Sequence, residues 1–295
     1  MAKSQDRLYV FLLLLFSSMA FQSCASKSAK GDEQNSSFQD MRKSYSTVLK
    51  TRGPAPQEWR AVSTMPGVTE VAYTSGDLKL KAWLAMPKNA QSEKVPAVVY
   101  FHGGFAFSMD EFNDCQPFLD AGFAVMIPTL RGENGNPGNF ELFYGEIDDA
   151  RAAIATLAKQ PRIDASRIYT FGHSAGGGIS ALLSLWEDVP IRFGGSSGGL
   201  YSKDAFYGWK DFVPFDLSNE KERRLRLLVG NMSSMKRKHI AYLGEDDTLA
   251  KVVDAADSEI KKSSAPLTIS IIGGDHFSSL DLAVSSFANA IKLDK

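Results

Sequence analysis

The residues of this chain whose types and spacing could do chemistry begin with one serine. Ser174 is the apex of Gly172-His173-Ser174-Ala175-Gly176, which follows a β-branched and aromatic run at residues 168–171. After the glycines, the stripe of an amphipathic helix recurs at Ile179, Leu182, Leu183 and Trp186. Glycines two before and two after the apex remove side chains that would clash in so sharp a turn. The pattern predicts a nucleophile elbow that exposes the Ser174 hydroxyl at the carboxyl end of a strand.

A second match to the same motif is Gly194-Gly195-Ser196-Ser197-Gly198. It follows a plausible strand at residues 191–193, but no helical stripe comes after it. Because a true elbow opens a helix, we interpret Ser196 as a turn residue and Ser174 as the candidate nucleophile. A glycine-rich turn without chemistry is the alternative interpretation of Ser174.

A serine hydroxyl needs an adjacent base, and the chain has four histidines. His276 lies just past the last predicted strand, in the loop 273–276, and is the candidate general base. His173 neighbours the serine, where its side chain should project away from the nucleophile. His239 precedes its strand and so belongs to the opposite edge of a parallel sheet. His102 follows a strand directly, where a structural hydrogen bond is the favoured role.

An imidazole works best when a carboxylate fixes its tautomer. The end of the preceding strand offers Gly244-Glu245-Asp246-Asp247, from which Asp247 is favoured and Asp246 is the alternative. The resulting order is serine, acid, histidine, which is the chain order of α/β-hydrolases.

Hydrogen-bond donors that stabilise the oxyanion of the transition state complete the predicted active site. The backbone N–H of Ala175 is one expected donor, and the loop His102-Gly103-Gly104-Phe105 supplies another, at Gly104 or Phe105. Each such donor typically contributes about 3 kcal/mol in the transition state.

These residues need a scaffold, and the hydrophobic pattern predicts one. A hairpin at residues 68–73 and 78–86 opens the sheet, and strands and helices then alternate. Strands are expected at 95–101, 123–128, 168–171, 191–193, 240–243 and 267–272, and helices at 110–121, 147–157, 179–186, 249–256 and 280–291. Alternation of this kind predicts an α/β fold with a doubly wound, mostly parallel sheet flanked by helices. Ligands bind beyond the carboxyl ends of the strands in such sheets.

The amino-terminal residues are typical of an export signal. Lys3 and Arg7 precede a short apolar run, and small residues lead to Cys24. We predict a signal peptide over 1–23, lipidation of Cys24, a flexible tether over 24–50 and a catalytic domain over 51–295. The expected location is the bacterial cell envelope, with the chain anchored to a membrane by lipid. Ordinary cleaved export and an uncleaved anchor are the alternatives.

Composition excludes several other functions. A net charge of −1 gives no reason to expect a nucleic-acid partner. With two cysteines, one of them predicted to carry lipid, Cys115 is interpreted as a core thiol on a helix. No Cys-x-x-Cys or His-Glu-x-x-His spacing occurs, so neither a structural zinc site nor a zincin site is expected. The favoured chemistry needs no metal and no cofactor, and we expect none. Four aromatic residues in the irregular segment before residue 238 either line a pocket or serve packing: Tyr207, Trp209, Phe212 and Phe215.

From about residue 68 onward the chain resembles the α/β-hydrolases, and among them the prolyl-oligopeptidase-like (S9-like) and dienelactone-hydrolase-like esterases. The resemblance rests on Arg131–Gly135, on Tyr144, Gly145, Glu146 and Asp148, on Arg162–Asp164 before Arg167, and on Gly172–Gly177. Two departures are visible. The residues ahead of Val68 are too few for the β-propeller of the family's peptidases, and the loop is His-Gly-Gly-Phe where lipase-like esterases have His-Gly-Gly-Gly.

The resemblance and the motifs together predict a serine hydrolase that acts on carboxylic esters through an acyl-serine intermediate. A serine peptidase acting on short peptides is the first alternative. A non-catalytic envelope lipoprotein is the second, and a metal-dependent hydrolase using Asp246, Asp247 and His276 is the third.

Overall fold

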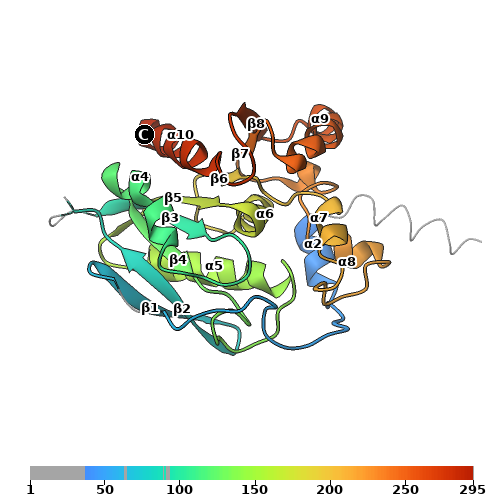
Figure 1. Ribbon diagram of the computed structural model, residues 1–295, viewed down its shortest axis with the longest axis horizontal. Helices are drawn as coiled ribbons and strands as arrows, with labels where there is room; N and C mark the ends of the chain where they lie inside the picture. The colour runs from blue at the N-terminus through green and yellow to red at the C-terminus, as the bar shows by residue number, and fades with distance from the viewer. Residues whose placement is uncertain (1–36, 63–64, 89, 91–93, 295) are drawn as a thin grey trace, which may run out of the picture. The chain divides into compact units, whose positions relative to one another are not determined.

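A twisted sheet of eight strands forms the centre of the protein (Figure 1). The computed structural model describes residues 37–62, 65–88, 90 and 94–294. The strand order is β1-β2-β4-β3-β5-β6-β7-β8, in which β1 pairs antiparallel with β2, β2 antiparallel with β4, and the remaining pairs are parallel. The strands are β1 (Val68–Ser75), β2 (Leu78–Ala85), β3 (Val95–Phe101), β4 (Ala124–Pro128), β5 (Ile163–Gly172), β6 (Gly194–Ser197), β7 (His239–Gly244) and β8 (Leu267–Ile272). The predicted doubly wound, mostly parallel sheet is confirmed.

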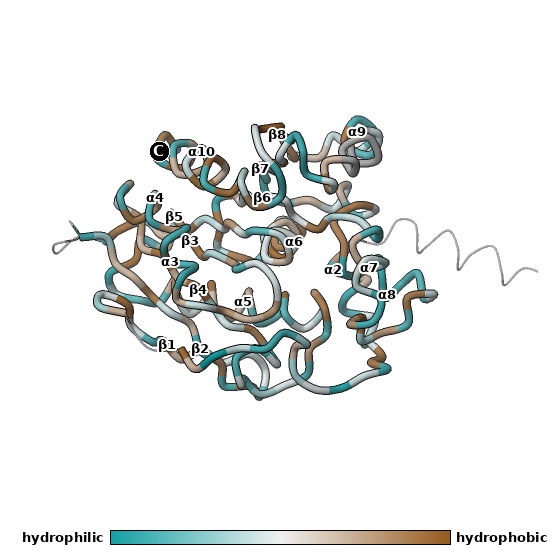
Figure 2. The backbone as a smooth tube through the Cα atoms, in the orientation of Figure 1, coloured by the Kyte–Doolittle hydropathy of each residue, from teal (hydrophilic) through white to brown (hydrophobic). Residues whose placement is uncertain are grey.

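Helices cover both faces of the sheet, and each face has its own apolar core. One core packs α5 (Gly145–Ala158) and α6 (Ser174–Leu183) against the strands. The other contains α3 (Glu111–Asp114), α4 (Gln116–Asp120) and α10 (Leu280–Leu293). In Figure 2 brown and teal segments alternate along α10, as expected for a helix that buries one side. β3 is buried on both faces from Ala97 to Phe101, which explains its nearly continuous apolar sequence.

The single helix predicted over 110–121 is wrong, because the structure divides it into α3 and α4 at Cys115. Pro117 lies in the first turn of α4. Proline has no N–H and clashes with the preceding turn, so it is tolerated at the start of a helix and not in its interior. Cys115 is fully buried between the two short helices, and burial raises the pKa of its thiol.

The strand predicted at 191–193 is displaced to β6, and the interpretation of Ser196 as a turn residue is wrong. Ser196 lies within β6 and is fully buried. A glycine-rich strand is required here because neighbouring side chains fill the space that a Cβ would need. A Cβ at Gly195 would lie 2.5 Å from the Phe287 ring, and one at Gly194 would lie 2.7 Å from Thr170 Oγ1.

The predicted tether, residues 24–50, is wrong over residues 37–50. Residues 38–43 form α2 (Phe38–Lys43), in which Phe38 and Met41, three residues apart, are buried. Arg42 donates to the carbonyl of Tyr144 from both terminal nitrogens, at 3.2 Å each. The buried side chains of Phe38 and Met41 therefore pack this otherwise polar segment against the domain. The predicted signal peptide and Cys24 lie outside the described residues.

The remaining helices lie in the segments that follow β6 and β7. They are α7 (Asp204–Gly208), α8 (Glu220–Arg224), two 3₁₀ helices (Met232–Ser234 and Thr248–Lys251) and α9 (Val252–Ser263). In Figure 1 α2, α7 and α8 lie together. Within the described part of the chain, every helix is too short or too polar to cross a bilayer.

Candidate active site

Ser174 lies between β5, which ends at Gly172, and α6, which it begins. Its φ is +52°, a left-handed conformation that costs an L-residue free energy and recurs at functional sites. A Cβ on Gly172 would fall on the carbonyl of Gly176, and a Cβ on Gly176 would fall on the carbonyl of Phe101. Both glycines are thus required for the turn, which leaves the Ser174 side chain partly exposed. The strand, the sharp turn and the helix expected of an elbow are present, and the role of Ser174 as a nucleophile stays a prediction.

His276 and Asp247 meet beyond the ends of β8 and β7. The Nδ1 of His276 lies 2.8 Å from Oδ2 of Asp247, whose side chain is 1% exposed. Asp247 Oδ1 accepts a hydrogen bond from the Leu249 N–H at 2.8 Å, which fixes the carboxylate. With the proton held on Nδ1, the basic nitrogen of the ring is Nε2. Asp246 is exposed, so of the two acids it is Asp247 that the structure joins to the histidine.

Gly198 borders this pair from the end of β6. Its φ is +55°, and a Cβ there would lie 2.7 Å from His276 Nδ1 and 3.0 Å from Asp247 Oδ2. The residue therefore keeps open the space in which the two side chains meet. Gly198 is the last glycine of the second Gly-x-Ser-x-Gly match. The sequence therefore marked this segment, but we interpreted it as a turn and not as a neighbour of the His276–Asp247 pair.

His173 links the elbow to the histidine loop. The Nε2 of His173 lies 2.9 Å from the carbonyl oxygen of His276, and the ring centroids of the two histidines are 4.9 Å apart. Burial lowers the pKa of His173, so the ring is neutral near pH 7 and donates from Nε2 to that carbonyl. The residue next to Ser174 thus holds the backbone of His276. Sequence reasoning assigned His173 no role beyond pointing away from the nucleophile.

The loop after β3 carries the predicted oxyanion donors. Gly104 adopts a φ of +66°, and the Phe105 N–H donates to Oε1 of Gln57 at 2.8 Å. Ala175, the other predicted donor, is buried in the first turn of α6. Gln57 was not found from the sequence, because nothing in a polar segment 48 residues upstream marks it as a neighbour of this loop.

A buried ion pair supports the same loop. His102 Nε2 lies 3.2 Å from Oε2 of Glu133, which also accepts from the Leu130 N–H at 2.7 Å. Burial alone would lower the pKa of His102, but the charge of Glu133 and its hydrogen bond outweigh it and raise that pKa to about 9. The imidazolium also lies near Glu111. The expected structural role of His102 agrees with this geometry.

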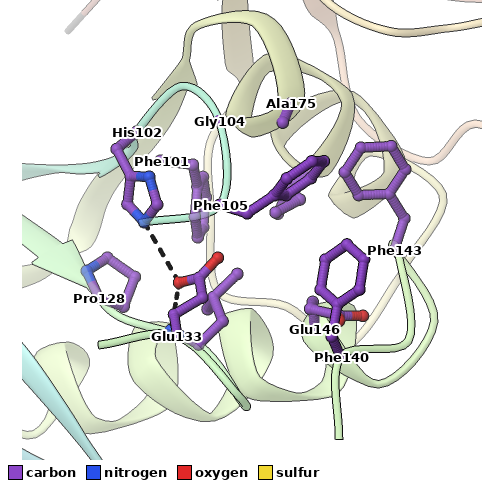
Figure 3. A pocket seen from close by; sticks show the side chains of 12 residues that line it. Phe101, His102, Gly104, Phe105, Pro128, Glu133, Phe140, Phe143, Glu146 and Ala175 are labelled. Carbon is purple, nitrogen blue, oxygen red and sulfur yellow. Dashed lines mark hydrogen bonds and ion pairs between the residues drawn. The ribbon is translucent and has the colours of Figure 1, made fainter. Parts of the chain in front are cut away.

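A small cavity of about 10 Å³ lies beneath the loop, with room for about one water molecule (Figure 3). Figure 3 shows the rings of Phe105, Phe140 and Phe143 around it, with Ala175 at its rim. Glu146 also lines it, and burial raises the pKa of this carboxyl to about 8. Its Oε1 accepts from two backbone N–H groups, whereas Oε2 is buried without a partner. The cavity wall is therefore mostly apolar, with two acids: Glu133, which is paired with His102, and Glu146, which is largely neutral at pH 7.

The aromatic residues after β6 divide into two kinds. Phe215 is buried, and the Trp209 ring contacts Phe105 edge-on with centroids 5.0 Å apart. Tyr207 and Phe212 are each 54% exposed. Trp209 thus borders the loop 102–105, the predicted oxyanion loop, whereas Phe215 serves packing.

The serine of the second motif, Ser196, forms a buried hydrogen-bonded cluster with His239 and Tyr201. Ser196 Oγ lies 2.7 Å from His239 Nε2 and 2.5 Å from the Tyr201 hydroxyl. All three side chains are buried, and burial lowers the pKa of His239 to about 3. A neutral histidine with no access for substrate indicates a structural role. Among the described residues, no group of three or more His, Cys, Asp or Glu side chains is placed to hold a metal ion.

Comparison with known proteins identifies the family of this chain. The family model BD-FAE matches residues 84–270, more than half of the chain. The chain belongs to the BD-FAE family. This is an α/β-hydrolase family, in agreement with the fold, and the match runs from the end of β2 into β8.

The BD-FAE chain is also similar to individual proteins. It is 28% identical over 183 residues to the Bacillus subtilis (strain 168) protein named "Uncharacterized peptidase YtmA", which covers 62% of this chain and 63% of that protein. Two solved structures share the fold. Pyrococcus horikoshii acylaminoacyl peptidase has a TM-score of 0.60 and 20% sequence identity, and the match covers 77% of this chain and 40% of that one. Esterase Est22 has a TM-score of 0.60 and 16% sequence identity, and the match covers 77% of this chain and 81% of that one. The BD-FAE chain thus spans less than two thirds of the length of YtmA and of the Pyrococcus enzyme.

Proposed function

We propose that this chain is a serine hydrolase in which Ser174 is the nucleophile, His276 the general base and Asp247 the acid that orients it. The observation that carries the proposal is the hydrogen-bonded pair of His276 and the buried Asp247, held through His173 beside a serine in a strained elbow. A serine, an imidazole and a carboxylate recurring in this relation are the parts of a catalytic triad. Membership of an α/β-hydrolase family and the peptidase-named relative support the same class of reaction.

The reaction proceeds in two halves. Nε2 of His276 takes the proton of the Ser174 hydroxyl as the oxygen attacks the substrate carbonyl carbon, and Asp247 stabilises the imidazolium. The developing oxyanion accepts hydrogen bonds from the Ala175 N–H and from the loop at Gly104 and Phe105. The imidazolium then protonates the leaving group, whose bond to the carbonyl carbon breaks, and acyl-serine remains.

Water completes the second half. His276 takes a proton from a water molecule, the hydroxide oxygen attacks the acyl carbon, and the Ser174 oxygen leaves with the proton that His276 returns. The products are a carboxylic acid and the regenerated serine.

We infer carboxylic esters as the substrate class, because an alcohol leaves the tetrahedral intermediate more readily than an amine and demands less of the site. Short peptides are the second candidate, which the peptidase name of the 28%-identical relative favours. No cofactor takes part in either scheme.

The test compares hydrolysis of p-nitrophenyl acetate with that of a dipeptide p-nitroanilide by the parent chain and by Ser174→Ala. We expect ester hydrolysis by the parent and a rate for the variant that is lower by roughly 10⁴-fold or more. Amide hydrolysis without ester hydrolysis would replace the first substrate class by the second. Equal rates for parent and variant would remove the serine mechanism.

Export and lipid anchoring through Cys24 are a further part of this proposal and rest on the sequence alone. Metabolic labelling with radioactive palmitate should mark the parent chain and not Cys24→Ser. Equal labelling of the two chains would contradict the proposal.

A further inference from the structure

A segment ahead of the sheet, residues 45–59, crosses the catalytic edge and is here termed the strap. Its start is held by Glu222, which accepts from the Tyr45 hydroxyl at 2.7 Å and from the Val48 N–H at 2.8 Å. Glu222 is itself paired with Arg226 at 2.6 Å, and both side chains are buried. The strap thus begins at a fixed charged anchor rather than at a loose surface contact.

The middle of the strap is tied to the loop that follows β4. The Phe140 N–H donates to the carbonyl of Gly53 at 2.8 Å, and the Ala55 N–H donates to the carbonyl of Gly132 at 2.9 Å. Gly132 has no room for a side chain between the strap and residue 140, since a Cβ there would lie 3.1 to 3.4 Å from backbone atoms of both. These bonds bring Gln57, two residues farther along, to the oxyanion loop.

The side chain of Gln57 is hydrogen-bonded to the N–H of Phe105, one of the predicted oxyanion donors. Its Oε1 lies 2.8 Å from the Phe105 nitrogen and would lie 2.5 Å from a Cβ on Gly104, so it covers both predicted donor residues of that loop. A backbone N–H can only donate, so the amide must present its oxygen. A neutral carbonyl oxygen on an oxyanion donor has the position and polarity of a substrate carbonyl.

We propose that Gln57 is an internal occupant of the oxyanion hole, and that the substrate carbonyl must displace it before Ser174 can react. This inference rests on the proposed serine mechanism and adds to it a residue that controls access to the site. Gln57 is exposed to solvent, so its side chain can rotate outward while the hydrogen bonds of the strap stay in place. The strap therefore lowers the resting reactivity of the site without blocking it permanently.

Variants of Gln57 have opposite expected effects. Gln57→Ala removes the occupant, and Gln57→Asn keeps an amide that is one methylene too short to reach Phe105. Because one neutral hydrogen bond no longer has to be broken, both should react roughly 2- to 12-fold faster than the parent. Gln57→Glu retains the reach and adds a negative charge, and charge-assisted hydrogen bonds are about twice as strong, so it should react more slowly. Glu58→Ala, at the next exposed position of the strap, is the matched control and should leave the rate unchanged.

The experiment measures the second-order rate constant for phosphonylation by a fluorophosphonate, whose phosphoryl oxygen must enter the same hole. Ser174 Oγ bonds to phosphorus, fluoride leaves, and His276 takes the serine proton. Thermal unfolding of each chain verifies that the strap variants are folded. Faster reaction of Gln57→Ala and Gln57→Asn with slower reaction of Gln57→Glu supports the proposal. A parent that reacts, with both shortened variants equal to it or slower, overturns it and leaves the serine mechanism standing. Failure of all chains to react overturns both proposals.

Discussion

Replacing Gly198 by alanine should displace His276, the proposed general base. The new Cβ would lie 2.7 Å from His276 Nδ1, whereas ordinary contacts begin at about 3.4 Å, so the ring or the backbone must yield by about 0.7 Å. The same Cβ would lie 3.0 Å from Asp247 Oδ2, so His276 and Asp247 cannot both move away from it and keep their present geometry. Misplacing a catalytic group by about 1 Å costs on the order of 100-fold in rate. We therefore expect kcat/KM for an ester to fall roughly 10- to 100-fold.

A matched control separates this displacement from backbone strain. Gly76, in the turn between β1 and β2, has a φ of +54° against +55° at Gly198, and a Cβ there would have nothing within 4 Å. Alanine at either position therefore carries a similar strain of about 1–2 kcal/mol, measurable by urea unfolding. Only Gly198→Ala should lose activity, as measured by ester hydrolysis. If Gly198→Ala and Gly76→Ala hydrolyse the ester equally well, the argument for a space reserved for the His276–Asp247 pair is refuted.

Three other predictions concern Asp247, the His102–Glu133 ion pair beside the predicted oxyanion loop, and helix α2. Asp247→Asn should lower kcat roughly 10³- to 10⁴-fold, because the His276 imidazole loses both the group that fixes its tautomer and its counter-charge. The kcat of Asp246→Asn should be close to that of the parent. Equal losses of kcat in the two variants would contradict the assignment of Asp247. The pKa of His102 is raised from 6.5 to about 9, so its stabilisation is complete below pH 6.5 and is lost as pH rises through about 9, with an expected fall of about 3 kcal/mol in the free energy of unfolding. Urea titrations across that range should show this fall for the parent and not for Glu133→Gln, and the same slope in both would refute the ion-pair argument. Phe38→Ala should destabilise the domain by about 3–5 kcal/mol, since Phe38 is 0% exposed, and an unchanged urea midpoint would show that α2 is not part of the folded unit.

The sequence was sufficient for the parts of the site that depend on local pattern. The elbow at Ser174 and the loop of His276 each follow a strand of clear apolar pattern, and a parallel sheet brings the carboxyl ends of such strands to one edge. The choice of Asp247 over Asp246 was only a preference, because both follow β7 and only the turn decides which carboxylate faces inward.

Other parts depend on contacts between residues far apart in the chain. The strand at β6 was misplaced because glycines are poor strand formers, and the closely packed Phe287 that demands them comes from α10. Gln57 and Phe38 lie in polar sequence whose role is set by the surfaces they meet, the oxyanion loop and the Trp186 ring at 6.0 Å. Local propensity carries no information about such partners.

The central claim is that Ser174 is a nucleophile activated by His276. Incubation of the purified chain with a fluorophosphonate, followed by digestion and mass spectrometry, locates the modified residue directly and needs no knowledge of the natural substrate. We predict one phosphonylated peptide carrying the adduct on Ser174, none in Ser174→Ala, and strongly reduced adduct in His276→Ala. A folded parent chain that stays unmodified, or that carries its adduct on another residue while Ser174 is free, would contradict the account.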